Sequence, residues 1–446
     1  MNAAGIALVV VCVAMILLLP RRGAVLGMML AVCYVTQGQQ FDVFGFHFTV
    51  IRVALLAGLT RVLTHGESKQ LAPTAIDRSV VAYTVALISI STVRVGNSAE
   101  FVFQLGCAFD ILLSYFVFRC LITSAADVEE VLSALAWFII PLAVLMCREA
   151  TGALNIFSVF GGVPEYAEVR EGHVRCMGPF RSPITAGSFG ASLALLYLAL
   201  FLRGLRRQTA LTGLLASLAI MITSHSSGPL LAFGGGLAAL TFWRLRAEMR
   251  AVRWGIAVTL VGLHLAMKAP VWFLIAKVSD LTGGGGYHRS ALIDQFIQNF
   301  RSWALLGTSD SGKWMATQLA DGTADITNAF VCAGVNAGVV GLFLFLSIFV
   351  KGFQLVGRAR QAAAAAEDSV AEWLVWALGG VLFAHALNLI SVTYFDQVST
   401  AWYMFLGMLA TVAQENLNQY PLSAVLPAKT TSGSTGVFRE TVGCNL

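Results

Sequence analysis

Residues 283–307 read GGGGYHRSALIDQFIQNFRSWALLG, and the rest of the chain is organised around this stretch. The four glycines accept unusual backbone dihedrals without steric cost. After them, apolar residues recur at helical spacing: Leu292, Ile293, Phe296, Ile297, Phe300 and Trp303. Polar residues fall on the opposite side: Asp294, Gln298 and Arg301. The spacing predicts an amphipathic helix that lies at a membrane surface.

Two titratable side chains, His288 and Arg289, stand at the start of this helix. Arg289 is in line with the apolar side, so its guanidinium would lie at the level of the lipid headgroups. Guanidinium groups and the free N–H groups of a helix N-terminus both bind phosphate or pyrophosphate. The alternative is that Arg289 only extends to water. His288 could exchange a proton with a hydroxyl near neutral pH, or it could pack as an aromatic partner of Tyr287.

The composition is that of a membrane protein. Of the 446 residues, 57% are hydrophobic and 12% charged, with a mean hydropathy of +0.76, which excludes an ordinary soluble globular domain. Apolar runs long enough to cross a bilayer predict an all-α polytopic fold with about 12–14 transmembrane helices. The expected spans are 3–19, 24–40, 49–63, 79–95, 101–121, 131–148, 185–202, 209–223, 228–243, 254–270, 329–350, 372–390 and 400–413. The eight cysteines form neither a disulfide framework nor a metal-ligand pattern.

The charges orient these spans. Basic clusters fall on one side of the alternation: Arg21 and Arg22; Arg61, Lys69 and Arg78; Arg203, Arg206 and Arg207; Arg244, Arg246, Arg250 and Arg253; Lys351, Arg358 and Arg360. The positive-inside rule makes that side cytoplasmic. We therefore expect one transmembrane domain, residues 1–413, with its N-terminus and two long loops, about 149–184 and 271–328, on the periplasmic face of a bacterial inner membrane. Segment 3–19 lacks the features of a cleaved signal peptide, and residues 414–446 are expected to form a disordered cytoplasmic tail.

The first long loop ends in an ordered turn. Residues 175–183 read RCMGPFRSP, and this glycine–proline pattern predicts a bent, rigid approach to the next span. Arg175 and Arg181 would thereby be held near the membrane interface. They could bind anionic lipid headgroups without specificity, or a specific anionic partner.

Charged residues also fall at membrane depth. Arg52 is expected near the external end of its span, and Asp110 lies within the span 101–121. Charges at this depth are costly and usually pair or line a polar cavity, so Arg52 and Asp110 are candidates for such a cavity.

Four motifs now give a family resemblance. Residues 175–183 resemble the "R..G.F..P" segment of the O-antigen ligase and Wzy-type O-antigen polymerase superfamily, and Ser226-Ser227-Gly228 resembles its "S-R-G" helix break. Residues 289–307 resemble its "R…W/F…G" loop, and residues 328–341 its "H-N…G..G" segment. The motifs occur in the family's order over about 170–350.

The resemblance implies a membrane glycosyltransferase of the GT-C type. Its donor would be an undecaprenyl-pyrophosphate-linked glycan and its acceptor a second glycan, with no cofactor and no metal. By the matched positions, Arg175 and Arg289 would contact the pyrophosphate, with Arg181, Asn328 and Arg52 as further substrate-binding candidates. Guanidinium groups would stabilise the departing pyrophosphate as the C–O bond breaks.

The chain departs from the family pattern at two positions. Thr327 replaces the histidine that precedes the asparagine, and a threonine cannot act as a general base at neutral pH. Ser227 replaces the arginine of the helix break. His288 or Asp325 could supply the base instead, although Asp325 could also be an ordinary solvated residue beside a span. Alternatively, catalysis relies mainly on stabilising the leaving group, with Arg289 as its central residue.

Loss of the histidine favours a polymerase, which joins lipid-linked repeat units into O-antigen, capsule or exopolysaccharide. The alternatives are a ligase that transfers glycan to lipid A core or another acceptor, and a flippase for lipid-linked sugar. A flippase should carry charges through many spans and halves of matching pattern, whereas polar residues here gather in external loops. The expected partners are the bilayer, the lipid-linked donor and acceptor, and a chain-length regulator, with no nucleic acid.

Overall fold

The structure is a computed structural model, and it describes residues 1–43, 46–280, 286–315 and 325–421. Within them the chain is almost entirely helical. The helices are α1 (Ala3–Leu18), α2 (Arg21–Tyr34), α3 (Val50–His65), α4 (Ala75–Val95), α5 (Ser98–Leu121), α6 (Ala125–Gly152), α7 (Pro183–Arg203), α8 (Arg207–Thr223), α9 (Ser227–Thr241), α10 (Met249–Ala266), α11 (Leu274–Asp280), α12 (Gly286–Gln298), α13 (Phe300–Trp303), α14 (Ala329–Ala365), α15 (Ser369–Asn388) and α16 (Asp396–Gln419). Two short antiparallel hairpins complete the fold: β1 (Gln40–Val43) with β2 (Phe46–Thr49), and β3 (Glu168–Arg170) with β4 (His173–Arg175).

The prediction of an all-α polytopic membrane protein is confirmed at this level. Six described helices, α4, α5, α6, α7, α14 and α15, are long and apolar enough to cross a bilayer, or seven if α10 is counted together with residues 271–278, which are bent by 98° from it. The remaining expected spans also fall on helices, but these are shorter or less apolar. Helix α2 ends at Tyr34, whereas the expected span ran to residue 40, because β1 begins at Gln40. Helix α16 continues to Gln419, beyond the expected boundary at 413, and residues 422–446 of the expected tail lie outside the described residues.

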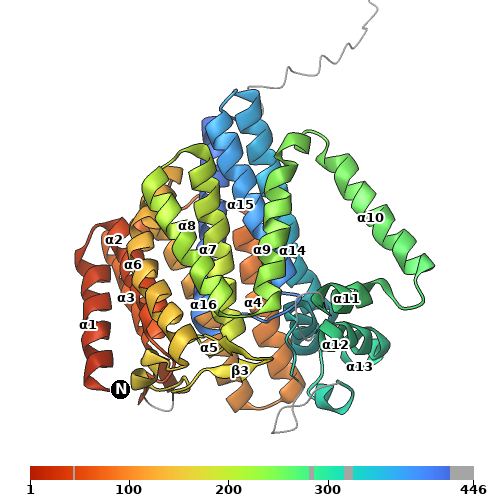
Figure 1. The fold of residues 1–446 in the computed structure, drawn as a ribbon, viewed down its shortest axis with the longest axis horizontal. Helices are drawn as coiled ribbons and strands as arrows, with labels where there is room; N and C mark the ends of the chain where they lie inside the picture. The colour runs from red at the N-terminus through yellow and green to blue at the C-terminus, as the bar shows by residue number, and fades with distance from the viewer. Residues whose placement is uncertain (44–45, 281–285, 316–324, 422–446) are drawn as a thin grey trace, which may run out of the picture.

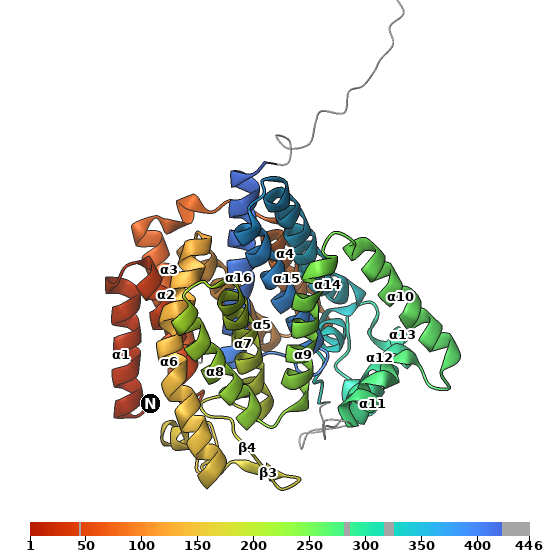
Figure 2. The same cartoon turned by 45° about the horizontal axis from the view of Figure 1, so that its top comes forward.

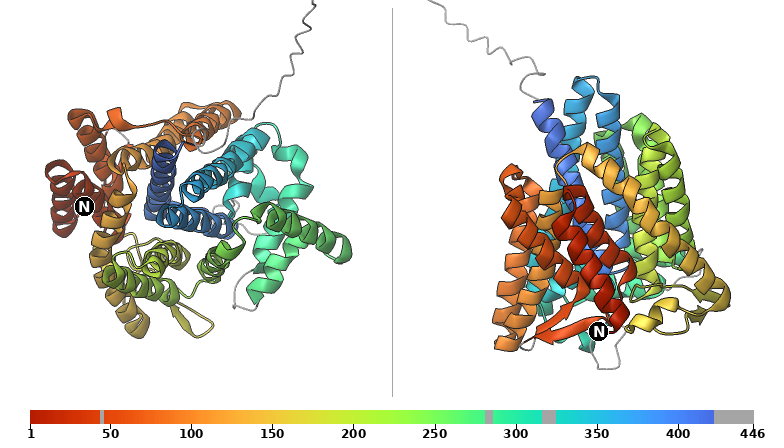
Figure 3. Two further views of the ribbon diagram at one scale, coloured as in Figure 1. Left: turned by 90° about the horizontal axis from the view of Figure 1, so that it is seen from above. Right: turned by 90° about the vertical axis from the view of Figure 1, so that its left-hand side faces the viewer.

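The helices run up and down between two ends (Figure 1). The arginine-rich connections between α1 and α2, α7 and α8, and α9 and α10 gather at one end. The described parts of the two long connections gather at the other, which we call the loop end. The view from above shows the blue helices α15 and α16 near the centre, with other helices around them (Figure 3). This segregation agrees with the charge alternation of the sequence.

Helix α10 differs from the others. None of its residues is buried, and in two views it stands apart from the bundle while α11 to α13 lie at the loop end (Figures 1 and 2). By contrast, 78% of the residues in the most apolar 18-residue segment of α7 are buried within the protein.

Helix α14 is broken near the loop end. Ala337 and Gly338 leave helical geometry, and Gly338 adopts φ 63° and ψ −162°, a region open essentially only to glycine. The segment after α13 fills the break, because the Val339 N–H donates to the Ala304 carbonyl at 2.9 Å. Arg94 donates to the released carbonyls of Val335 and Asn336 at 2.8 and 2.9 Å. The single span expected over 329–350 is therefore two joined segments.

The amphipathic helix α12 packs on protein. Leu292 and Phe296 of its apolar side are buried and join Trp303, Val331 and Val335 in one cluster. Ile297 and Phe300 remain exposed. The predicted helix and its apolar face are present, but α14 covers much of that face, where a membrane surface was expected.

Candidate functional site

The β3–β4 hairpin presents one polar face. Glu168 pairs with Arg175 and Arg170 with His173, so these four side chains lie on the same face while the paired valines between them lie on the other. Glu171 and Gly172, with φ 54° and 78°, form the two-residue turn that such hairpins favour. The alternation Glu-Val-Arg and His-Val-Arg thus directs four charged or titratable groups to one side.

Arg175 connects this hairpin to the start of α9. Its Nη1 lies 3.1 Å from Glu168 Oε2 and its Nη2 donates to Ser226 Oγ at 3.3 Å. The next residue is fixed as well, since the Cys176 N–H donates to the Thr223 carbonyl at 3.0 Å. The Nε of Arg175 is buried and makes no hydrogen bond with the described residues.

Arg289 approaches the same turn from α12. Its Nη1 donates to Ser227 Oγ at 3.4 Å. Ser226 and Ser227 begin α9 without a side-chain cap. Gly228 follows in close packing, because a Cβ there would lie 3.0 Å from Ser391. Two arginines from loops more than a hundred residues apart therefore meet at one helix N-terminus.

Like charges face one another here. Burial, together with the positive charges of Arg170 and Arg175, lowers the pKa of Arg289 from its usual value. We call Arg170, Arg175 and Arg289 the arginine group. An anion bound among them would relieve their mutual repulsion.

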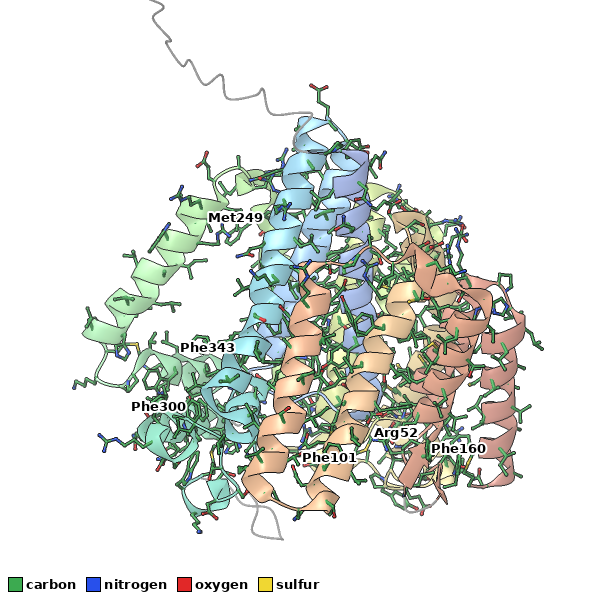
Figure 4. All side chains as sticks on the ribbon, turned by 180° about the vertical axis from the view of Figure 1, so that it is seen from behind. Arg52, Phe101, Phe160, Met249, Phe300 and Phe343 are labelled. Atoms are coloured by element: carbon green, nitrogen blue, oxygen red, sulfur yellow. The ribbon has the colours of Figure 1, made fainter. Side chains whose placement is uncertain are left out.

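Arg52 and Arg181 belong to a second set of charges. Arg52 binds Asp110 through two hydrogen bonds of 2.8 and 2.7 Å, so these two cavity candidates form an ion pair. Arg181 lies 3.9 Å from Asp396 and over the ring of Phe395. We call Arg52, Asp110, Arg181 and Asp396 the paired group. Figure 4 shows Arg52 at the same end of the bundle as Phe300 of α13 and opposite Met249, which begins α10.

The turn between the two arginines of the first loop is held rigidly. The carboxylate of Glu149 accepts the N–H groups of Met177 and Gly178, each at 3.0 Å, and Asn155 donates to the Gly178 carbonyl. Gln397, at the start of α16, donates to the carbonyls of Val35 and Pro179 at 3.0 and 2.8 Å. The ordered turn expected from the glycine–proline pattern is present.

The other predicted site residues lie around the same end. Asn328 caps α14, its side-chain oxygen accepting the N–H groups of Phe330 and Val331, which ties that oxygen to the helix start. Thr327 has a buried hydroxyl that makes no hydrogen bond with the described residues. His288 lies in the first turn of α12, beside Arg289, and Asp325 precedes α14; both are partly exposed.

Sequence reasoning missed four contributors. Glu149 stands at the start of the expected loop 149–184 and was given no role, although the polar turn that it binds was predicted. Ser226 was quoted for its motif without a function. His173 and His225 are stacked with their ring centroids 4.7 Å apart, and no local pattern joins positions so distant along the chain.

No three His, Cys, Asp or Glu side chains form a metal-ligand group within the described parts of the chain. Comparison with known proteins finds no matching family model and no matching curated protein. What the chain does must therefore be argued from its own geometry.

Proposed function

We propose that this chain is a membrane glycosyltransferase that joins undecaprenyl-pyrophosphate-linked oligosaccharide repeat units into a polysaccharide at the periplasmic face of a bacterial inner membrane. The observation that carries the proposal is the meeting of Arg175 and Arg289 at Ser226 and Ser227, the first residues of α9. The order of motifs shared with O-antigen polymerases and ligases supports it.

The arrangement suits a pyrophosphate leaving group. In the transfer, an acceptor hydroxyl attacks the anomeric carbon of the donor sugar, and the bond from that carbon to the pyrophosphate oxygen breaks. Negative charge develops on the departing pyrophosphate, and oriented guanidinium groups with free helix N–H groups stabilise it.

The acceptor must also lose a proton. His288 stands beside Arg289 in the first turn of α12, and Asp325 stands two residues before Thr327 at the entrance to α14. We propose one of these two as the base. Arg181 and Arg52, which belong to the paired group, would contact the glycan or its lipid-proximal sugar.

A glycan profile of a strain deleted for this protein tests the proposal. Complementation with Arg175→Ala or Arg289→Ala should leave single repeat units where wild type gives long chains. Arg301→Ala is the matched control, because Arg301 is exposed on the neighbouring helix α13, and it should restore long chains. Immunoblotting of membranes confirms insertion of each variant.

Two other outcomes discriminate the alternatives. Long polymer that stays on its lipid carrier in the deletion strain would indicate a ligase. Full-length polymer from correctly inserted Arg175→Ala and Arg289→Ala would refute the pyrophosphate site.

A further inference from the structure

Two histidines from separate segments stack beside the arginine group. His173 belongs to β4 and His225 to the turn between α8 and α9, and their rings lie nearly parallel, with 15° between the planes. Both side chains are exposed, so a soluble ligand can reach them.

The backbone is bent to bring His225 into this position. Its φ is 41°, in the left-handed region that costs about 1–2 kcal/mol for a residue with a side chain. The next residue is Ser226, which accepts the hydrogen bond from Arg175. The turn that aims the imidazole therefore also supplies the arginine group with a hydrogen-bond partner.

The groups around this pair are mostly cationic. Partial burial is the largest cause that lowers the pKa of His225, and the electrostatic effects of His173 and Arg175 of β4 act in the same direction. From β3 come Arg170 and Glu168, and Glu168 is already bound to Arg175.

The remaining neighbours belong to the hairpin tip and to α12. Glu171 of the tip lies 3.8 Å from Arg170, and both are largely exposed. Arg289 of α12 feels the charges of Arg170 and Arg175. Without an anion, another positive charge on the imidazole pair is therefore opposed by its surroundings.

We propose that His173 and His225 are a third phosphate-binding element of this site, and that the pair takes up a proton from solvent when a diphosphate binds at Arg175 and Arg289. The inference rests on the proposed function, because it assigns the same ligand to the same site. A protonated histidine pair would supply positive charge near the position at which this chain has Ser227 in place of an arginine.

The direction of the effect follows from linkage. Partial burial and the nearby charges lower the pKa of His225 in the free protein, whereas a bound diphosphate would raise it, so lowering the pH strengthens binding. One proton changes the dissociation constant by at most about tenfold per pH unit. The change is confined to about pH 5–8, where imidazole groups titrate.

Isothermal titration of the full-length protein in lipid nanodiscs with sodium pyrophosphate measures the proton directly. At pH 7, repeating the titration in buffers of different ionisation enthalpy gives the number of protons taken up for each ligand bound. His225→Phe retains an aromatic ring for stacking, and His225→Gln retains polarity. Both should lower the uptake relative to wild type. The ligand's own protonation is common to all the proteins and cancels in the difference.

His65→Gln is the matched control, because His65 is an exposed histidine that ends α3 at the opposite end of the bundle. It should leave the uptake unchanged. Equal proton uptake by wild type, His225→Phe and His225→Gln would overturn the inference.

The design separates this inference from the function on which it rests. Pyrophosphate binding that Arg289→Ala abolishes, but with unaltered proton uptake in the histidine variants, overturns the histidine role alone. Absence of pyrophosphate binding to the wild-type protein overturns both.

Discussion

The arginine group and the paired group lie at the same end of the molecule but differ in the balance of positive and negative charge. In the paired group, carboxylates meet the arginines: Arg52 binds Asp110 at 2.7 Å, and Arg181 faces Asp396 at 3.9 Å. In the arginine group, Glu168 lies beside Arg175 and Glu171 beside Arg170, but the positive charges of Arg170 and Arg175 still lower the pKa of Arg289. Ion pairs such as those of the paired group hold helices and loops together. Guanidinium groups that lie close to one another favour the binding of an anion. Under the proposed function, this difference would separate a binding surface from its support.

The largest expected effect comes from the break in α14, near which α12, the helix of Arg289, packs. Gly338→Ala places a Cβ 2.4 Å from the Leu305 carbonyl oxygen in a backbone region essentially closed to alanine. It should lower the free energy of unfolding by about 1–3 kcal/mol or more. Because α12 packs on this part of α14, pyrophosphate affinity should fall as well. Thermal unfolding and ligand titration measure the two effects.

Gly357→Ala is the matched control on the same helix, since a Cβ there meets nothing within 4 Å. It should be neutral or slightly stabilising. A Gly338→Ala protein that unfolds and binds like wild type would show that the break does not support the site.

A smaller effect is expected at Glu149, which supports both groups through the turn at 176–181. Glu149→Gln replaces a carboxylate that accepts two N–H groups, and this should cost about 1–3 kcal/mol. Arg175 and Arg181 flank the turn, so phosphate binding and the contact with Asp396 should both weaken. Glu165→Gln, an exposed change in the same loop, should do neither. Normal unfolding of Glu149→Gln in denaturant would contradict this role.

The smallest effect is expected within the paired group. Asp110→Asn removes the charge opposite Arg52, and because the Asp110 side chain is 41% exposed, the cost should be about 1 kcal/mol or less. Pyrophosphate affinity should stay within about twofold of wild type, since the arginine group is untouched. A larger loss of affinity in the same titration would show that the two groups act as one.

The helices could be predicted because apolar runs are local signals. The end of the bundle at which each connection lies could be predicted because arginine clusters are local signals too. The motif arginines Arg175 and Arg289 were predicted to contact one pyrophosphate; they meet at the start of α9, and their role in binding stays a prediction. The β3–β4 hairpin was predictable in principle, since Glu-Val-Arg and His-Val-Arg flank a Glu-Gly turn, but it was passed over within a loop.

Other features could not be deduced from local pattern. The break at Gly338 depends on carbonyl groups of residues 304 and 305 that reach into α14, and glycine in an apolar run looks ordinary. The apolar side of α12 has the same periodicity whether lipid or protein covers it. The stacking of His173 on His225 and the partnership of Arg52 with Asp110 are tertiary contacts, so their spacing in sequence carries no sign of them.

Gln397, near the start of α16, joins two segments that are synthesised long before it. Its amide holds the carbonyl of Val35, which lies 362 positions earlier in the chain, and that of Pro179. At common rates of protein synthesis, about 20 to 70 seconds separate the appearance of these two ends. The turn between Arg175 and Arg181 therefore lacks one of its hydrogen bonds until α16 has been synthesised. A chain interrupted before α16 would lack the amide that joins this turn to the end of α2.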